Sequence, residues 1–272
     1  MRVVPSAAPT AVAAWCEGRL SPVAAAPQGA LLAADSWLVD EGRVRGYDAH
    51  WTRFSGWCAS QRIALDELAG FRAAVTAALP RGGRWFPRVD LIGGAPVEAG
   101  AAQLVLRLRP AQPLMREARV LLAEPGDLRR HPTRKGPDLA LLLKLRARAV
   151  AAGADELVLR DGDGRLVEGA LNSLLWWEEE TLWATPDERT LPSITRALLF
   201  AIAHERGVTV QRRSPLPGEL AGRETWLVNA AHGICVVRAW DPPDVAAGAA
   251  PRAASWRAAL DATARHLDEG WA

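Results

Sequence analysis

The chain has 272 residues, and its 33 Lys and Arg residues against 31 Asp and Glu residues give a formal net charge of +2. This balance gives no reason to expect nucleic-acid binding, and no apolar run reaches the roughly 18 residues of a membrane span. The hydrophobic fraction of 49% and three scattered cysteines exclude disordered and disulfide-rich secreted proteins. We therefore expect a cytoplasmic enzyme with no nucleic-acid or membrane partner and no metal site, since no metal-ligand spacing occurs.

In the first half of the chain, short apolar segments alternate with turns. Periodicity and turn residues predict two hairpin strands, two helices and two further strands. The hairpin strands lie at residues 31–39 and 42–44. The first helix begins at residue 48, and the second spans residues 65–79. The two further strands lie at residues 85–92 and 103–109. Pro110 and Pro113 then interrupt the chain, because proline cannot continue a central strand. This predicts a small N-terminal domain over residues 1–112, a linker at 113–115 and a larger domain over 116–272.

The second half has clearer boundaries between its elements. Its predicted helices lie at residues 139–152, 194–206 and 252–267. Its predicted strands lie at residues 156–160, 165–168, 173–177, 181–184, 224–230 and 234–239. The sequence DGDG at residues 161–164 is typical of a tight turn, because glycine tolerates positive φ. No Gly-x-Gly-x-x-Gly follows a strand, so we expect a mixed α/β (α+β) fold that does not bind dinucleotides.

Five separated segments carry the strongest functional signal. They are HWTRF at residues 50–54, Lys135 ahead of a helix leading into GADE at 153–156, DGDGRLVEG at 161–169, TP at 185–186 followed by LPSITR at 191–196, and NAAHGICVV at 229–237. In this order they resemble the fold-type IV family of pyridoxal-phosphate enzymes, which includes class IV aminotransferases and aminodeoxychorismate lyases. The resemblance implies a two-domain fold like that of D-amino-acid aminotransferase, with pyridoxal 5′-phosphate (PLP) in the interdomain cleft, and a homodimer.

Lys135 is the residue at which the resemblance places the reactive lysine. Only Lys135 and Lys144 occur in the whole chain. A lysine amine forms a Schiff base with PLP when it is partly deprotonated, which burial and neighbouring cations favour. Lys144 falls in the middle of a predicted helix, where a solvated side chain is expected. The alternative for Lys135 is a plain charge in an arginine-rich loop.

Glu168 resembles the family residue that holds the pyridine nitrogen of the cofactor in its protonated state. The apolar neighbours Leu166 and Val167 predict that its carboxylate is partly buried. A buried carboxylate needs a cationic partner, and a pyridinium would supply one. The alternative is an ordinary exposed carboxylate on a strand.

The resemblance also implies a set of groups that bind the cofactor phosphate. They are Arg53, Ser193, Ile194, Thr195, Ala230 and Ala231. A helix that begins after Ser193 presents unbonded N–H groups and a favourable dipole, to which the Thr195 hydroxyl adds a donor. Ser193 can also act simply as the N-cap. Arg53 offers a forked, charge-assisted contact, and the backbone of the two alanines approaches from another side.

The chain departs from the family pattern at several positions. Ser193 replaces a glycine, Val236 replaces a proline, and Ser173 stands where the pattern has an asparagine, which appears one residue earlier as Asn172. Residues 34–39, ADSWLV, replace the Gly-Asp-x-x-Phe-Glu-Thr segment that borders the substrate. The cofactor residues are therefore retained, whereas the substrate residues do not transfer.

These observations predict a class IV aminotransferase that moves an amino group between an amino substrate and a 2-oxo acid through a Lys135 Schiff base. Lys135 would also transfer the proton at the substrate Cα, while Glu168 maintains the electron sink. A lyase of the 4-amino-4-deoxychorismate type, which releases pyruvate and an aromatic amine, is nearly as well supported. The sequence Asn229-Ala230 and the single tyrosine favour it. A non-catalytic relative acting as a binding protein is the third interpretation.

Overall fold

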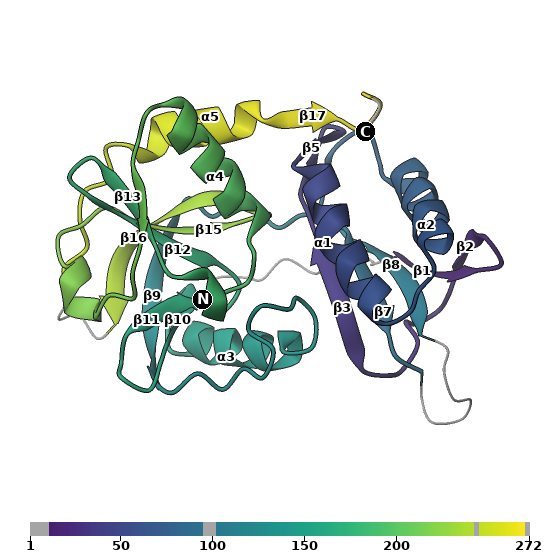
Figure 1. Ribbon diagram of the computed structural model, residues 1–272, viewed down its shortest axis with the longest axis horizontal. Helices are drawn as coiled ribbons and strands as arrows, with labels where there is room; N and C mark the ends of the chain where they lie inside the picture. Colours follow the sequence, from purple (N-terminus) through teal and green to yellow (C-terminus); the bar gives the residue numbers. More distant parts are fainter. Residues whose placement is uncertain (1–10, 95–101, 242–244, 270–272) are drawn as a thin grey trace. The chain divides into compact units, whose positions relative to one another are not determined.

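The computed structural model describes residues 11–94, 102–241 and 245–269. The chain forms two compact units, one made of Met1–Pro113 and Ala264–Ala272 and the other of Leu114–Thr263. Each unit combines helices with β-sheet (Figure 1), which confirms the expected mixed α/β fold. The sequence carried no signal that the chain returns to its first unit after residue 263.

A five-stranded antiparallel sheet forms the centre of the first unit, with strand order β2-β1-β8-β7-β3. Its strands are β1 (Ala11–Cys16), β2 (Arg19–Pro22), β3 (Leu31–Ser36), β7 (Arg88–Ile92) and β8 (Gln103–Leu108). The single strand expected over residues 85–92 is wrong. Arg84–Trp85 form a separate strand, β6, and β7 begins only after Pro87, which has no N–H to donate to a sheet.

Helices α1 (Tyr47–Ser60) and α2 (Leu65–Ala78) pack on this sheet (Figure 1). Four residues of α1 recur at helical spacing and are buried, namely Tyr47, Trp51, Phe54 and Cys58. The ring of Trp51 meets those of Phe54 and Phe71 nearly edge-on, with centroids 5.9 Å apart in both pairs. The aromatic residues of this unit therefore form its core.

The C-terminal segment departs from the sequence-based expectation. The helix predicted over residues 252–267 ends early, as α5 (Ala253–Ala262), and Ala264–His266 form the strand β17. This strand pairs with β5 (Arg43–Arg45) in a small sheet that also holds β4 (Val39–Asp40) and β6. Leu267, only 3% exposed, joins the core of the first unit. Pairing with a distant strand and burial of Leu267 thus outweigh the local helical periodicity.

An eight-stranded mixed sheet forms the second unit, with strand order β11-β10-β9-β16-β15-β12-β13-β14. The strands are β9 (Glu117–Pro125), β10 (Glu156–Arg160), β11 (Leu166–Gly169), β12 (Ser173–Glu178), β13 (Thr181–Ala184), β14 (Val210–Arg212), β15 (Thr225–Asn229) and β16 (Gly233–Asp241). The sequence predicted neither β9 nor β14. β9 lies between β10 and β16 and pairs with both in parallel, so it completes the sheet.

Both faces of this sheet are covered. Leu174 and Trp176 of β12 point to one apolar cluster, and Leu175 and Trp177 point to another. This explains why the strand has no polar alternation. Helices α4 (Ile194–Glu205) and α5 pack on the second cluster, while α3 (Leu139–Ala151) packs near β10. Two short 3₁₀ turns, Asp187–Arg189 and Pro217–Leu220, complete the unit.

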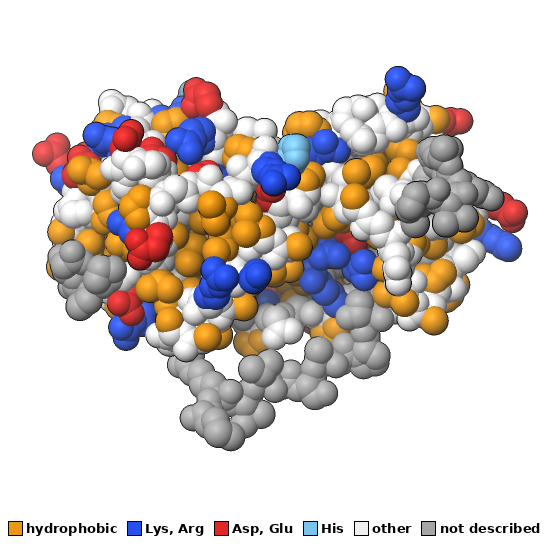
Figure 2. Space-filling model, turned by 90° about the horizontal axis from the view of Figure 1, so that it is seen from below, with side chains coloured by type: hydrophobic (Ala, Val, Ile, Leu, Met, Phe, Trp, Pro, Cys, Tyr) orange, Lys and Arg blue, Asp and Glu red, His pale blue; other side chains and the backbone are white. Residues whose placement is uncertain are grey.

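The surface mixes charged and apolar side chains, as Figure 2 shows for one face. The largest exposed apolar residues of the described chain are single leucines and a valine spread over several elements, which is ordinary for a folded protein. Along the described residues, no helix combines the length and the apolar character needed to span a bilayer.

Candidate active site

Lys135 lies in the loop between β9 and α3 and is half-buried. Hydrogen bonds fix the start of this loop, at Gly126, and the segment around Lys135, from His131 to Asp138. The N–H of Gly126 donates to the carbonyl of Arg160 at 3.2 Å, and the N–H of His131 donates to the carboxylate of Asp138 at 2.6 Å. The other lysine, Lys144, is exposed on α3. The loop thus holds one of the two lysines at a defined place beside the sheet.

Glu168 lies on β11 and is 4% exposed. Its Oε1 accepts hydrogen bonds from Arg129 Nη1 and from the backbone N–H of Leu191, the latter at 3.1 Å. Among the described residues, its Oε2 receives only the longer contact from the same Leu191 N–H, at 3.4 Å. The second carboxylate oxygen therefore retains capacity to accept a further donor, as a protonated pyridine nitrogen would be.

Arg129 joins three segments of the second unit around Glu168. Its guanidinium also binds Asp127, with Nη2 to Oδ2 at 2.7 Å, and donates to the carbonyl of Arg189 at 2.8 Å. The side chain is only 3% exposed. Because Arg129 belongs to the loop of Lys135, it ties that loop to β11 and to the segment before α4. The sequence placed Arg129 among loop charges and missed this role.

Burial and the neighbouring charges shift the pKa values of the ionisable groups in this cluster. Burial raises the pKa of Glu168 to about 7, against the opposing effects of Arg129 and the Leu191 N–H. Burial by itself disfavours the ionised forms of Asp127 and Arg129. Their mutual ion pair outweighs it, lowering the pKa of Asp127 and raising that of Arg129. A second cation near Glu168, such as a pyridinium, would favour its ionised form further.

Ser193, Ile194 and Thr195 lie at the start of α4, as expected. Ser193 is the N-cap, since its hydroxyl oxygen accepts from the N–H of Arg196 at 3.3 Å. Within the described part of the chain, the N–H groups of Ile194 and Thr195 donate to no acceptor. A helix of 12 residues thus offers two N–H groups and its positive dipole end to an anion.

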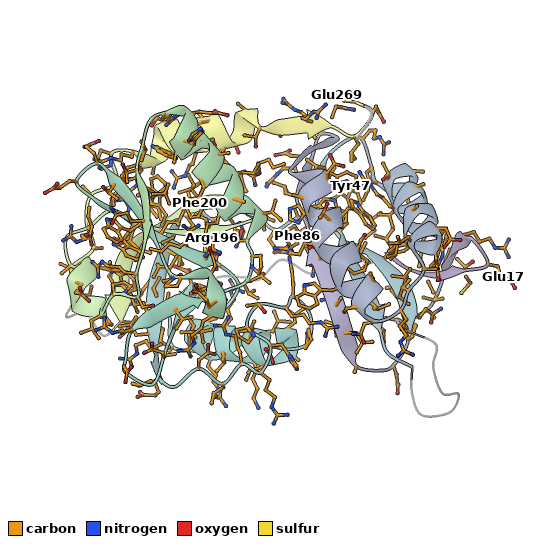
Figure 3. The ribbon with its side chains drawn as sticks, viewed as in Figure 1. Glu17, Tyr47, Phe86, Arg196, Phe200 and Glu269 are labelled. Atoms are coloured by element: carbon orange, nitrogen blue, oxygen red, sulfur yellow. The ribbon has the colours of Figure 1, made fainter. Side chains whose placement is uncertain are left out.

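Arg196 follows these residues and fixes the start of α4 to the preceding segment. It is 4% exposed, bonds the Asp187 carboxylate at 2.6 Å, and donates to the Thr190 hydroxyl at 3.1 Å. Its guanidinium lies 6.0 Å from the centroid of the Phe200 ring, one turn further along α4 (Figure 3). The Arg196 side chain therefore holds the helix start to the preceding segment without occupying the N–H groups of Ile194 and Thr195.

Ala230 and Ala231 lie in the tight turn between β15 and β16. Asn229 pairs with Gly233 across the hairpin, and Gly233 has a φ of +67°, which glycine adopts without strain. The side-chain oxygen of Asn229 accepts from the N–H of His232 at 2.7 Å. The turn that carries both alanines is thus closed by a side chain as well as by the backbone.

Arg53 belongs to the first unit, on α1. Its Nε and Nη2 each donate to the buried carboxylate of Asp35 at 2.8 Å. The same carboxylate binds His50 Nδ1 at 2.8 Å and accepts from the N–H of Ser36 at 2.7 Å. The sequence did not foresee this Asp35 pairing. It brings the guanidinium and the substituted segment at residues 34–39 together.

The second unit therefore fits PLP on two structural observations. Glu168 presents a buried carboxylate oxygen with spare accepting capacity, and the start of α4 presents two unbonded N–H groups. The sequence did contain signals for Arg129 as the partner of Glu168. A buried carboxylate needs a cation, and the loop before Lys135 is rich in arginine. What the sequence lacked was the fold that brings Arg129 to Glu168.

Comparison with known proteins agrees with this arrangement. The family model of amino-transferase class IV matches residues 32–240. Similar solved structures include a fold IV-transaminase from Curtobacterium pusillum, at 19% identity and a TM-score of 0.75, covering 92% of this chain and 97% of that one. The Escherichia coli branched-chain amino acid aminotransferase, at 14% identity, gives a TM-score of 0.79 and covers 95% and 99%. A hypothetical aminotransferase from Mycobacterium tuberculosis in its PLP-bound form, at 17% identity, gives 0.77 and covers 94% and 98%. No match was found among curated proteins.

The fold and the cluster around Glu168 thus define a PLP-dependent enzyme of the fold-type IV class. Because the family model spans more than half of the chain, this protein belongs to the class IV aminotransferases. The expectations of family, fold, enzyme class and cofactor are confirmed. The reaction, the roles of the individual site residues, the interdomain cleft, the homodimer and the cellular location stay predictions.

Proposed function

We propose that this protein is an aminotransferase that moves an amino group between an amino substrate and a 2-oxo acid, with Lys135 as the covalent attachment point of PLP. The observation that carries the proposal is the buried Glu168, held by Arg129 and Leu191 on one oxygen and able to accept at the other. The cytoplasm as its location and a homodimer as its assembly belong to the same proposal.

When bound, PLP supplies an aldehyde that captures an amine and a ring that withdraws electrons from the attached carbon. Glu168 would keep the ring nitrogen protonated, and Arg129 would orient that carboxylate. The N–H groups of Ile194 and Thr195 would bind the phosphate, together with the backbone of Ala230 and Ala231. Arg53, the backbone N–H of Ser193 and the hydroxyl of Thr195 are the further proposed phosphate ligands.

Lys135 has two tasks in this proposal. Its amine would hold the cofactor between turnovers, and during turnover the same amine would accept the proton at the substrate Cα. The loop supports both tasks, because the backbone bonds of Gly126 and His131 anchor it before and after Arg129 in the chain. A small-molecule amino acid and a small-molecule 2-oxo acid are the proposed substrates.

The two lysines of the chain provide the test. Borohydride reduction of the PLP-loaded protein, followed by peptide mass spectrometry, should place the pyridoxyl group on Lys135. Lys135→Ala should lose the label, the visible cofactor band and turnover, while its circular dichroism stays that of the wild type. Lys144→Ala is the matched control and should keep all three. A label on Lys144, or wild-type turnover by Lys135→Ala, would contradict the assignment.

The lyase alternative shares every one of these residues. The closing segment favours it, because it reads Asn229-Ala230 here and the Asn229 side chain closes the turn. Product stoichiometry separates the two reactions. An aminotransferase turns over only with a 2-oxo acid acceptor, whereas the lyase releases pyruvate from an aminodeoxychorismate-type substrate alone. A protein that neither binds PLP nor turns over either substrate would leave the binding-protein interpretation.

A further inference from the structure

A second polar network lies in the same unit, outside the cluster of Glu168, buried at one end and half-buried at the other. It consists of three side chains and one backbone group: Glu156 at the start of β10, Asn172 between β11 and β12, Asn229 at the end of β15, and the N–H of His232. Glu156 and Asn172 are 1% and 5% exposed. Family resemblance assigned no role to Glu156, and Asn172 is one of the departures from the family pattern.

The hydrogen bonds of this network form one continuous series. The N–H of His232 donates to Asn229 Oδ1 at 2.7 Å, and Asn229 Nδ2 donates to Asn172 Oδ1 at 2.6 Å. Asn172 Nδ2 donates to Glu156 Oε2. Glu156 Oε1 is taken by the N–H of Leu157 at 2.9 Å, so both oxygens of the carboxylate are used as acceptors.

The two ends of the series dictate its direction. A backbone N–H can only donate, and at the other end both oxygens of Glu156 act as acceptors, one of them from the backbone N–H of Leu157. Each asparagine between them must therefore present its oxygen toward His232 and its amide nitrogen toward Glu156. Turning either amide would oppose two donors or two acceptors. At the buried Asn172 an unmade hydrogen bond is costly, and at the half-buried Asn229 it costs less.

The series connects the two ends of the proposed cofactor site. Asn172 follows Glu168 after three intervening residues. Gly169 in that segment has no room for a side chain, since a Cβ there would lie 3.0 Å from the Cβ of Asn172. At the other end, Asn229 closes the turn that carries Ala230 and Ala231. Asn172 is thus fixed against the strand of Glu168 and bonded to the turn proposed to bind phosphate.

We propose that Asn172 and Asn229 are positioning residues that hold the Ala230–Ala231 turn in its phosphate-binding conformation, with Glu156 setting the direction of their amides. This inference rests on the proposed phosphate site. Loss of direction in the series breaks one of its hydrogen bonds, which loosens the connection between Asn172 and the turn and allows the turn to move. A turn that has moved would bind the phosphate of the cofactor more weakly. The residues that contact the pyridine ring would be unaffected.

The direction of the series can be reversed by moving its carboxylate from position 156 to position 229. In Glu156→Gln, the new amide nitrogen meets a donor whichever way it turns, either Asn172 Nδ2 or the N–H of Leu157, so one hydrogen bond of the network is lost. In Asn229→Asp, the new carboxylate opposes Asn172 Oδ1. In the double variant, the new amide at position 156 donates to a turned Asn172, which donates to the new carboxylate at position 229. That carboxylate still accepts from the N–H of His232. Every hydrogen bond is restored, and the total charge equals that of the wild type.

The measurement compares two cofactor forms on the apo-protein, titrated by fluorescence and visible absorption. One is PLP and the other is pyridoxal, which lacks the phosphate. Each single variant should bind PLP about tenfold more weakly, the effect of one mismatched buried hydrogen bond. Pyridoxal affinity should change by less than about twofold, since it makes no phosphate contact. The double variant should recover PLP affinity to within about threefold of the wild type.

Glu224→Gln is the matched control, because Glu224 is a buried carboxylate of the same unit, 5% exposed, that lies outside the series. It should leave the ratio of PLP to pyridoxal affinity unchanged. Single variants with wild-type PLP affinity, or equal losses for both cofactor forms, would overturn the proposal. If the single variants do not fold, the double variant decides alone, and its failure to fold and to bind PLP overturns the proposal. A wild-type protein that binds no PLP would refute the proposed function instead.

Discussion

Replacement of Arg129 by methionine tests the charge cluster around Glu168 most directly. The variant keeps an unbranched side chain of similar length and removes the charge that Asp127 and Glu168 share. Both carboxylates are nearly inaccessible, with side chains 4% and 6% exposed. Removing one partner of a buried ion pair costs about 3–5 kcal/mol, because the other charge stays buried and uncompensated. We expect Arg129→Met to lower the free energy of unfolding of the apo-protein by that amount at pH 8.

The loss should depend on pH in a definite direction. In the wild type, the pKa of Asp127 is lowered, so its pairing with Arg129 stabilises the fold above the ordinary pKa of aspartate. In the variant, both buried carboxylates cost free energy only while they are ionised. The penalty should therefore shrink by about 1 kcal/mol or more between pH 8 and pH 5, since each unit of pKa shift corresponds to about 1.4 kcal/mol.

Urea unfolding followed by circular dichroism measures both quantities. Arg238→Met is the control, because Arg238 pairs with Glu117 at 2.9 Å in the same unit but with side chains 46% and 58% exposed. An exposed pair contributes about 0–1 kcal/mol. Equal losses for the two variants, or a loss for Arg129→Met that is the same at pH 5 and pH 8, would refute the description of Arg129 as a buried counter-ion.

Substitutions at three more positions test single contacts of the second unit. Glu168→Gln should lower turnover on the order of 100-fold, because a neutral amide cannot hold a pyridinium, while PLP retention measured by absorbance falls much less; equal losses would indicate a structural role. Ser193→Ala should lower the free energy of unfolding by about 1 kcal/mol through loss of the N-cap, whereas Ser193→Asp should keep the cap but weaken inorganic phosphate binding, measured by calorimetry. Burial raises the pKa of Glu156 from 4.5 to about 7, so the folded state binds its proton more tightly and stability should fall as pH rises through this window. A stability–pH profile that is no flatter in Glu156→Gln than in the wild type would contradict this.

Local patterns were enough to predict several parts of this protein. Helical spacing predicted a helix over residues 65–79, and α2 lies there with Leu68, Phe71 and Val75 buried together in the core. LPSITR at residues 191–196 predicted a helix start with Ser193 as its cap, and α4 begins there. The order of the five motifs predicted the family. Each of these features depends on residues close together in the chain, so sequence carries the information directly.

The tertiary structure decided what depends on residues far apart in the chain. The segment Ala264–His266 has a helical pattern, yet it pairs with β5, which lies more than 200 residues earlier in the sequence, and no local rule anticipates such pairing. Likewise, the apolar neighbours of Glu168 indicated that its carboxylate is buried and needs a cation. Only the fold brings Arg129, 39 residues earlier in the sequence, to that carboxylate. The direction of the Glu156–Asn172–Asn229 series is also invisible in the sequence, because hydrogen-bond direction depends on which donors and acceptors meet. Sequence therefore determined the family and the cofactor chemistry, while folding determined the partners that set the charge and orientation of each proposed site residue.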